Sequence, residues 1–359
     1  MRLRIASIVC LCFLLPVLLI SCSKKTVPAR SLVIYPAPPD STRIQYLTSF
    51  STSIDISGKR SSLKSSVIGE EQVLELRKPY GLATSPGKIY VCEPGSGAIA
   101  VVDLGKKKFT LFTPDGKGKL RMPVNCCTDE EGRLYVADAE RGDVVVFDKN
   151  LQYLTSLANP FPGRDFKPLD VCVTADKIWV TNSKGAAVCT YNKTDYAFST
   201  IIADSLPSET KLFYNPINIT AGAGKVFVTD FGDFKIKVFD ESGQFLYDIG
   251  QYGKAPGQFV RPKGLAVDKD QVLFVVDAGF ENVQLFNEQG KLLMYFGGPY
   301  KTQGDMWLPA KVHIDYSNLA YYKKWVSKEY ELRYLIFVTN QYGPDKVSVY
   351  GAVNPAPVK

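Results

Sequence analysis

One histidine, His313, is present among the 359 residues, and this limits the chemistry that the side chains can perform. A metal centre built from several imidazoles is excluded, because such a centre needs more than one histidine. Eight cysteines are present, but none belongs to a Cys-x-x-Cys pair, so covalent attachment of a c-type haem is excluded as well. The remaining candidates for a functional site are side chains with carboxylate, amide or amine groups that recur at regular spacing along the sequence.

Asn125, Asp170 and Asn218 form the best candidate for a cation site. Each stands two residues after a proline, and the three positions recur at nearly equal spacing. Carboxylate and amide oxygens are ligands that calcium accepts. The set holds only one carboxylate, however, and Asn and Asp are also common in turns. We therefore expect no cofactor, with calcium at these three residues as the alternative.

The elements that position these residues follow a repeat of about 46 residues. Each copy begins with a proline and later carries an aromatic-Val-x-acid/amide tetrad. The six prolines are Pro79, Pro123, Pro168, Pro216, Pro262 and Pro309. The six tetrads are Tyr90–Glu93, Tyr135–Asp138, Trp179–Asn182, Phe227–Asp230, Phe274–Asp277 and Phe337–Asn340. A β-branched residue then opens a third strand, and a fourth strand follows a turn.

Four short strands in each repeat are typical of a propeller blade. The sixth repeat ends near Val353 after its third strand, and one unassigned strand, Arg43–Phe50, precedes the first repeat. Pairing this strand with the last repeat would hide both open edges of the chain. The sequence therefore predicts an all-β fold over residues 43–353, a six-bladed β-propeller whose N-terminal strand completes the last blade.

Residues 250–268 carry a family resemblance. The segment GQYGKAPGQFVRPKGLAVD resembles an NHL repeat closely, and the other copies keep fewer of its glycines. The resemblance implies a six-bladed propeller of NHL type. It leaves the activity open, because such propellers include protein-binding, RNA-binding and catalytic members. Lactonase-like relatives place acid and amide side chains near the propeller axis, at positions like those of Asn125, Asp170 and Asn218.

The repeat register also indicates why most cysteines and the histidine are present. His313 takes the position of Ala83, Cys127, Cys172, Thr220 and Ala266 in the other copies. Residues of this kind fill gaps in a core, and buried cysteine behaves as a small hydrophobic residue. We expect packed, unreactive side chains here and assign no catalytic residue.

Basic and aromatic residues are expected around one end of the propeller axis. The residues close to the repeat prolines are Lys78, Arg121, Lys167, Arg261, Lys263 and Lys311. The loops that join second and third strands carry Arg141, Phe231, Phe234, Phe280 and Tyr342. Mixed aromatic and basic side chains are typical of protein interfaces, although scattered surface residues would give the same list.

An insertion distinguishes the last repeat. Twenty-four residues separate Asp315 from Asn340, against eight between Asp268 and Asp277. Leu319, Tyr322 and Val326 have helical spacing, which predicts a short helix. The helix either covers the edge of its own blade or forms a docking element, with Tyr321, Lys324 and Trp325 facing outward.

The N-terminal residues are typical of a bacterial lipoprotein. Residues 1–21 combine Arg2 and Arg4 with an apolar run, as a secretory signal peptide does. Leu19-Ile20-Ser21-Cys22 resembles a lipobox, which implies lipidation of Cys22. The proline-rich residues 22–42 are expected to form an extended tether, and residues 354–359 a short tail. Ser23 after the cysteine favours the outer over the inner membrane.

The charge balance excludes one class of partner. The formal net charge is +7, and loss of Arg2 and Arg4 with the signal peptide leaves +5, too little for a nucleic-acid-binding protein. The sequence favours a non-enzymatic scaffold or receptor for another envelope protein, held on the membrane by its lipid anchor. The alternatives are a cation-dependent lactonase- or lyase-like enzyme and a sensor of a small ligand or glycan at the axis.

Overall fold

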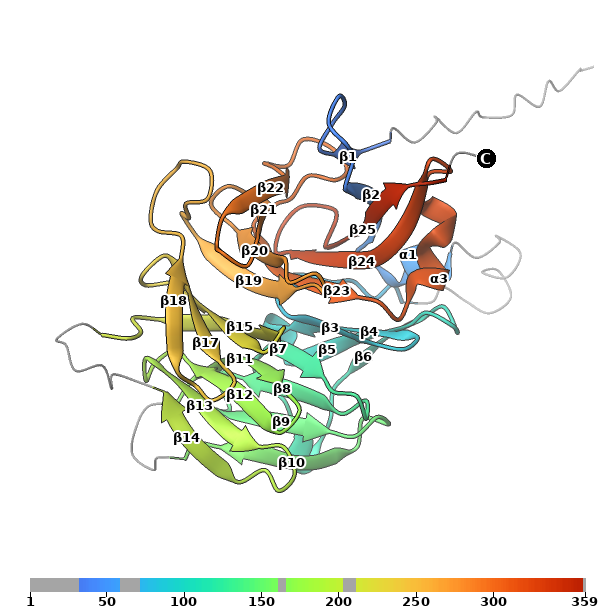
Figure 1. Cartoon of the computed structure of the whole chain (residues 1–359). Coiled ribbons are helices and arrows are strands. Elements are labelled where there is room, and N and C mark those ends of the chain that lie inside the picture. Colours follow the sequence, from blue (N-terminus) through green and yellow to red (C-terminus); the bar gives the residue numbers. More distant parts are fainter. Residues whose placement is uncertain (1–31, 59–71, 161–165, 203–210, 358–359) are drawn as a thin grey trace, which may run out of the picture. The chain divides into compact units, whose positions relative to one another are not determined.

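Six antiparallel sheets succeed one another along the chain in the computed structural model, which describes residues 32–58, 72–160, 166–202 and 211–357 (Figure 1). Blade 1 contains β3 (Leu82–Ser85), β4 (Lys88–Glu93), β5 (Ala98–Asp103) and β6 (Lys108–Phe112). Blade 2 contains β7 (Pro123–Thr128), β8 (Leu134–Asp138), β9 (Asp143–Phe147) and β10 (Tyr153–Ala158). Blade 3 contains β11 (Pro168–Val173), β12 (Lys177–Asn182), β13 (Ala187–Asn192) and β14 (Phe198–Ile202).

The second half of the chain repeats this plan. Blade 4 contains β15 (Pro216–Gly222), β16 (Lys225–Asp230), β17 (Lys235–Asp240) and β18 (Phe245–Ile249). Blade 5 contains β19 (Pro262–Val267), β20 (Leu273–Asp277), β21 (Asn282–Phe286) and β22 (Leu292–Gly297). Blade 6 contains β23 (Pro309–Asp315), β24 (Tyr330–Asn340), β25 (Val347–Pro355), β2 (Ile44–Phe50) and β1 (Ile34–Tyr35).

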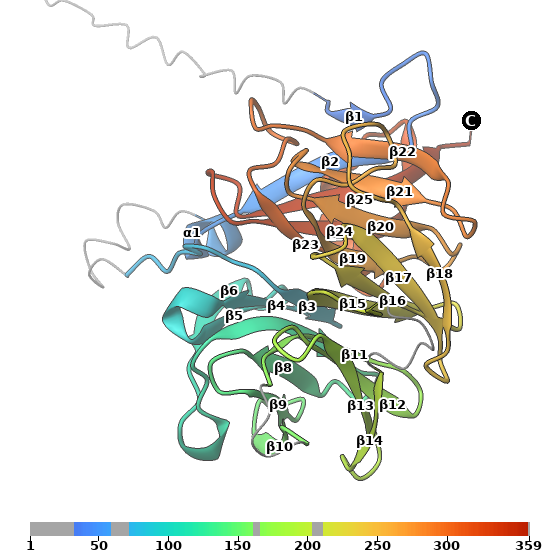
Figure 2. The same ribbon diagram turned by 90° about the vertical axis from the view of Figure 1, so that its left-hand side faces the viewer.

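The ring closes as the sequence predicts. The first strands of the blades contact one another in the order β3, β7, β11, β15, β19 and β23, and β23 contacts β3 again. β2 pairs with β25, with Ile44 opposite Ala352 and Phe50 opposite Val347. Figure 2 shows this N-terminal strand beside the C-terminal one. The predicted six-bladed propeller with a completing N-terminal strand is therefore confirmed.

The apolar core is divided among the interfaces between blades. Six clusters of buried side chains each join two neighbouring blades. The alternating apolar residues of the strands fill these clusters from both sides, because successive side chains of a strand point to opposite faces of its sheet. Each blade is therefore stabilised by the two beside it.

Part of the expected tether belongs to the folded body. β1 pairs with β2, and the Tyr35 hydroxyl donates to the Gly304 carbonyl oxygen at 2.9 Å. Tyr35 and Val33 pack against the cluster between blades 5 and 6. The tether expected for residues 22–42 thus differs from the structure at its C-terminal end, because these two apolar side chains find a place to bury.

The helices are short. In the described residues they are α1 (Ser53–Ser57), α3 (Leu319–Tyr322) and the 3-10 turns η1 (Pro94–Ser96), η2 (Gly116–Gly118) and η3 (Lys323–Trp325). α3 confirms the predicted helix in the insertion. No helix of the described residues is long and apolar enough to span a membrane.

Candidate functional site

The residues predicted for a cation site lie on the innermost strands. Asn125 on β7, Asp170 on β11 and Asn218 on β15 are completely buried. A fourth residue joins them, because Lys311 on β23 places its Nζ 2.6 Å from Asp170 Oδ2. Blades 3 and 6 stand opposite each other in the ring, so this ion pair spans the propeller axis.

Asp170 is held by several donors in addition to Lys311. Its Oδ2 accepts from Asn218 Nδ2 at 3.0 Å and from the Ile219 backbone N–H at 3.1 Å. Its Oδ1 accepts from its neighbour Val171 N–H at 2.9 Å. The arrangement therefore supplies Asp170 with a counter-charge from the protein itself.

Two amide oxygens beside Asp170 have no such partner. Asn125 Nδ2 donates to the Leu169 carbonyl oxygen at 3.0 Å, but Asn125 Oδ1 and Asn218 Oδ1 are buried and accept no hydrogen bond from the described residues. In the part of the chain that the structure describes, no three His, Cys, Asp or Glu side chains are grouped to hold a metal. A calcium ion at Asp170 would have to compete with the Lys311 ammonium, and the calcium site stays a prediction.

Two glycines allow inner strands of neighbouring blades to lie in close backbone contact. A Cβ on Gly81 would lie 2.4 Å from the Asn125 Cα, and a Cβ on Gly264 would lie 2.5 Å from the Lys311 Cα. Gly81 and Gly264 occupy the same repeat position as Asn125 and Lys311 in the blades next to them. Glycine is therefore required there by close backbone contact, not by a ligand.

Two residues predicted for the exposed interaction face are buried instead. Only 6% of Lys263 and 5% of Lys311 is exposed. Both lie on inner strands, β19 and β23, which contact the strands of the neighbouring blades. The prediction of exposure was wrong for these two lysines, because residues just after the repeat proline already belong to the ring interior.

The loops between second and third strands and the loops between blades lie on one face, which we call the loop face. In blade 5, Pro262 pairs with Asp277, Asp277 with Asn282, and Asn282 with Gly297. The ends of all four strands are therefore side by side. The same register in the other blades places Lys78, Arg121, Lys167, Arg261 and Tyr342 on this face, and all five are exposed.

Aromatic side chains are more numerous on the loop face than the sequence analysis predicts. Tyr214, Tyr252 and Trp307, in the loops between blades, are 51%, 62% and 48% exposed. The predicted Phe231, Phe234 and Phe280 are only partly exposed. The Phe234 ring lies 4.9 Å from the Tyr252 ring, centroid to centroid. The position of these aromatic residues shortly before the repeat prolines is the sequence signal for them, as it is for the basic residues of the same loops.

Arg141 has a structural task. Its guanidinium forms an ion pair with Asp143, Nε to Oδ1 at 2.8 Å, and donates to the carbonyl oxygens of Lys117 and Lys119 at 2.8 and 2.7 Å. It therefore holds the loop around η2 against blade 2. Arg141 lies on the predicted face, but these contacts leave little of its charge available to a partner.

The last residue of each aromatic-Val-x-acid/amide tetrad positions the loop face. Asp230 accepts from the backbone N–H groups of Tyr214 and Asn215 at 2.8 and 2.7 Å. The equivalent residues, which accept from the loop before their own blade in the same way, are Glu93, Asp138, Asn182, Asp277 and Asn340. Because these carboxylates and amides satisfy backbone donors, they fix the loops of this face.

The insertion of blade 6 reaches the neighbouring blade. Asn318 Oδ1 accepts from the Gly87 backbone N–H at 2.7 Å, and Asn318 Nδ2 donates to the Ser85 carbonyl oxygen at 3.1 Å. Gln45 on β2 donates to the Trp325 carbonyl oxygen at 2.9 Å. The insertion therefore packs across the seam between blades 6 and 1, where the chain closes.

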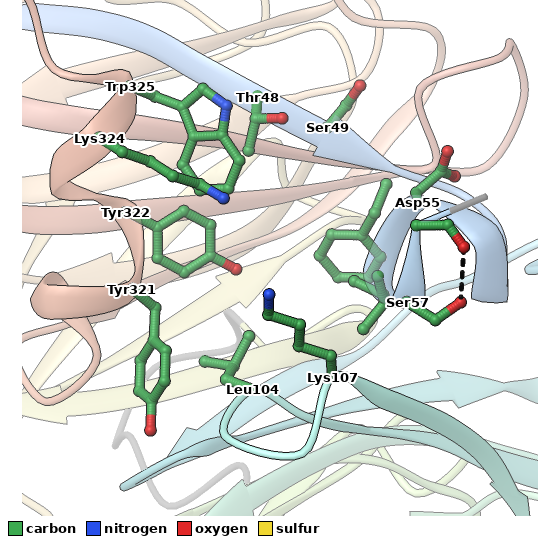
Figure 3. A pocket seen from close by; sticks show the side chains of 13 residues that line it. Thr48, Ser49, Asp55, Ser57, Leu104, Lys107, Tyr321, Tyr322, Lys324 and Trp325 are labelled. Atoms are coloured by element: carbon green, nitrogen blue, oxygen red, sulfur yellow. Dashed lines mark hydrogen bonds between the residues drawn. The ribbon is translucent and has the colours of Figure 1, made fainter. Parts of the chain in front are cut away.

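A pocket of about 300 Å³ lies beside the insertion (Figure 3). Tyr321 is 41% exposed and Lys324 is exposed, as predicted, whereas Trp325 is partly buried against Tyr322 with ring centroids 5.5 Å apart. Figure 3 shows Lys107 reaching towards Tyr322 from the turn after β5. The outward orientation predicted for Trp325 is wrong, because its ring covers the seam.

His313 and the described cysteines are packed side chains. His313 Nε2 lies 2.9 Å from Thr84 Oγ1, and burial together with the Lys311 charge lowers the pKa of His313 to about 3. The five described cysteines have free thiols. Burial raises the pKa of Cys172, and it raises that of Cys189 to about 12. The Cys172 and Cys189 thiols therefore stay protonated at neutral pH and are poor nucleophiles.

Comparison with known proteins supports the fold. A sequence family described as a 6-bladed beta-propeller, DUF5128, matches residues 206–354. No curated protein matches the chain. The chain contains a six-bladed β-propeller domain, and its NHL type stays a prediction.

Solved structures with the same fold include enzymes. A gluconolactonase from Xanthomonas campestris has a TM-score of 0.53 and 17% identity over 92% of this chain and 99% of its own. A streptogramin B lyase has a TM-score of 0.52 and 15% identity over 77% and 83%. A protein of unknown function from Bacteroides thetaiotaomicron has a TM-score of 0.57 and 13% identity over 78% and 70%. At these identities the likeness shows the fold alone.

Proposed function

We propose that this chain is a membrane-anchored, extracytoplasmic scaffold or receptor that docks another protein of the bacterial envelope on its loop face. The observation that supports this function is the set of exposed aromatic side chains there, Tyr214, Tyr252, Trp307 and Tyr342. Buried aromatic and arginine side chains provide much of the binding energy in protein interfaces. A face that carries such residues before any partner is bound is suited to that use.

The charge around the axis favours an acidic partner. Of the six residues directly before the repeat prolines, three are basic and none is acidic. These residues are Lys78, Met122, Lys167, Asn215, Arg261 and Leu308. A ring of this kind attracts an acidic surface and speeds its association. We therefore propose a partner that presents carboxylates to the centre of the loop face.

In the proposed function, lipidation of Cys22 holds the protein on the extracytoplasmic side of a membrane. This residue lies outside the described part of the chain, so the anchor depends on the sequence pattern alone. The outer membrane is favoured over the inner one by Ser23. The proposed function is non-enzymatic and involves no nucleic acid.

Crosslinking capture from intact envelopes, read by mass spectrometry, tests the docking function. The test variant carries Lys78→Glu, Lys167→Glu and Arg261→Glu on the loop face. A matched control carries Lys106→Glu, Lys149→Glu and Lys291→Glu, three exposed lysines in the turns between third and fourth strands, on the opposite face. We expect a defined partner with wild type and control, and its loss with the test variant.

Two results would contradict the proposal. Equal capture by the test variant would show that the loop face is not the docking surface. Retention of the Cys22→Ser variant in the membrane fraction would contradict the lipid anchor.

The cation-dependent alternative depends on one observation. The buried Asn125 Oδ1 and Asn218 Oδ1, on either side of Asp170, are oxygens that a cation would use. A sensor of a small ligand or glycan at the axis is the other alternative, and it predicts binding of the isolated protein without a partner.

A further inference from the structure

Three lysines are buried in the described residues, and they differ in their partners. Lys237 Nζ lies 3.0 Å from Asp233 Oδ2 and 3.5 Å from Asp248 Oδ1. Lys311 Nζ lies 2.6 Å from Asp170 Oδ2. Lys263, which is 6% exposed, donates only to the uncharged Gln341 Oε1 at 3.1 Å, and no carboxylate of the described residues forms an ion pair with it.

The charged side chains that act on Lys263 among the described residues are two cations, Arg261 and Lys78. The Lys263 Nζ lies 5.4 Å from the centre of the Tyr80 ring. Burial, and then the charges of Arg261 and Lys78, lower the pKa of Lys263 to about 8. Most of its amine is therefore still protonated at neutral pH. A buried charge without a counter-ion is costly, so this site is electrostatically incomplete.

The site has an accessible side. Arg261 and Lys78 are exposed on the loop face, and Lys78 Nζ lies 5.1 Å from the centre of the exposed Tyr342 ring. The three cations come from blades 5 and 1, and Gln341 comes from blade 6 between them. They lie at the end of the axis on the loop face, where the charges of Arg261 and Lys78 act on Lys263, and we call this group of side chains the axial mouth.

We propose that the axial mouth is a carboxylate-binding site, in which Lys263, Lys78 and Arg261 hold one carboxylate and Gln341 fixes the Lys263 amine. This inference rests on the proposed docking function, and the carboxylate is an acidic side chain of the docked protein. The bound carboxylate supplies the counter-charge that Lys263 lacks. Lys311 lies on the neighbouring inner strand, one repeat position further along than Lys263. Its charge is already neutralised by Asp170, so it does not compete with Lys263 for the bound carboxylate.

Thermal unfolding of the isolated protein tests the site with acetate and glutarate as probes, against chloride at equal ionic strength. A ligand that binds only the folded state raises Tm with its concentration. We expect such a rise in wild type and in the exposed-lysine control Lys291→Met. In Lys263→Met, we expect that at least a tenfold higher carboxylate concentration is needed for the same rise in Tm. Equal responses of wild type and Lys263→Met, or no response in wild type, would overturn the inference.

A second measurement does not depend on a variant. The pKa of the Lys263 amine, followed in wild type by the NMR shift of its labelled Cε, should start near 8 and rise when acetate is added. A bound anion favours the protonated amine. An unchanged pKa at saturating acetate would refute the site even if Lys263→Met fails to fold.

Capture from envelopes separates this inference from the proposed function. Loss of the partner with Lys263→Met supports a carboxylate of the partner at the mouth. Full capture by Lys263→Met would overturn this inference and leave docking through the loop face intact. Acetate binding without any captured partner would assign the site to a free carboxylate and overturn the partner as its source.

Discussion

Lys311 and Lys263 stand near the start of the inner strands of adjacent blades, and protein covers both almost completely. Lys311 reaches across the axis to Asp170, whereas Lys263 reaches only the neutral amide of Gln341. Lys311 thus forms a neutral ion pair in the interior, whereas Lys263, in nearly the same place in the adjacent blade, leaves the axial mouth with an unbalanced positive charge. The difference separates a structural contact from a candidate binding contact, although composition and burial are alike.

The largest expected effect is that of Lys311→Met. It leaves Asp170 buried without its counter-charge, and breaking a buried ion pair in this way costs about 3–5 kcal/mol. Urea unfolding followed by circular dichroism measures the loss. Adding Asp170→Asn should recover more than half of it. If Lys311→Met lowers the free energy of unfolding by less than about 1 kcal/mol, Lys311 is not a structural contact of the kind that distinguishes it from Lys263.

His313 is expected to have an intermediate effect on the pH dependence of stability, because the nearby Lys311 charge helps to lower its pKa. Its folded pKa of about 3 lies below the unfolded value of 6.5. Its contribution is therefore fully present above pH 6.5 and is lost as pH falls towards 3, by at most about 1.4 kcal/mol per pH unit. Urea unfolding of wild type and His313→Gln between these pH values should give a flatter profile for the variant. Parallel profiles would mean that the pKa of His313 is the same in the folded and unfolded states, so that the interior accepts a charged His313.

The smallest expected effect is that of calcium. Because the Lys311 ammonium already neutralises Asp170, millimolar calcium and chelator should leave Tm unchanged. Differential scanning calorimetry measures this directly. A calcium-dependent rise in Tm that Asp170→Ala abolishes would reverse the comparison, because the interior would then be the ligand site. It would also favour the cation-dependent enzyme.

The fold could be predicted because its signal repeats. The proline and the acid/amide tetrad recur six times, and the strand over residues 43–50 had no other place to pair. β1 gives no such signal, since a two-residue strand shows no period and depends on burial of Tyr35 and Val33. α1 was also missed, although Thr52 and Asp55 form the capping box that precedes such a helix.

The candidate site was predicted less well than the fold. Proximity to the repeat proline identified Lys78 and Arg261 as exposed residues, but it could not separate them from Lys263, where the chain enters the interior one residue after the proline. The Lys311–Asp170 pair was within reach, because both residues occupy the same repeat position in opposite blades and carry opposite charges. Gln341 and Tyr80 have no repeating pattern, and only the packed structure identifies them.

The closing strand has a consequence for how the chain matures. β2 is synthesised among the first residues of the body and β25 among the last, yet Ile44 must find Ala352. Contacts between such distant segments form slowly, because a very long loop has to close first. We therefore expect the ring to stay open until translation is nearly complete. For the exported protein proposed above, the open ring is the form that could pass through a translocation channel, and the pairing of β2 with β25 that stabilises the ring is also the step that completes it last.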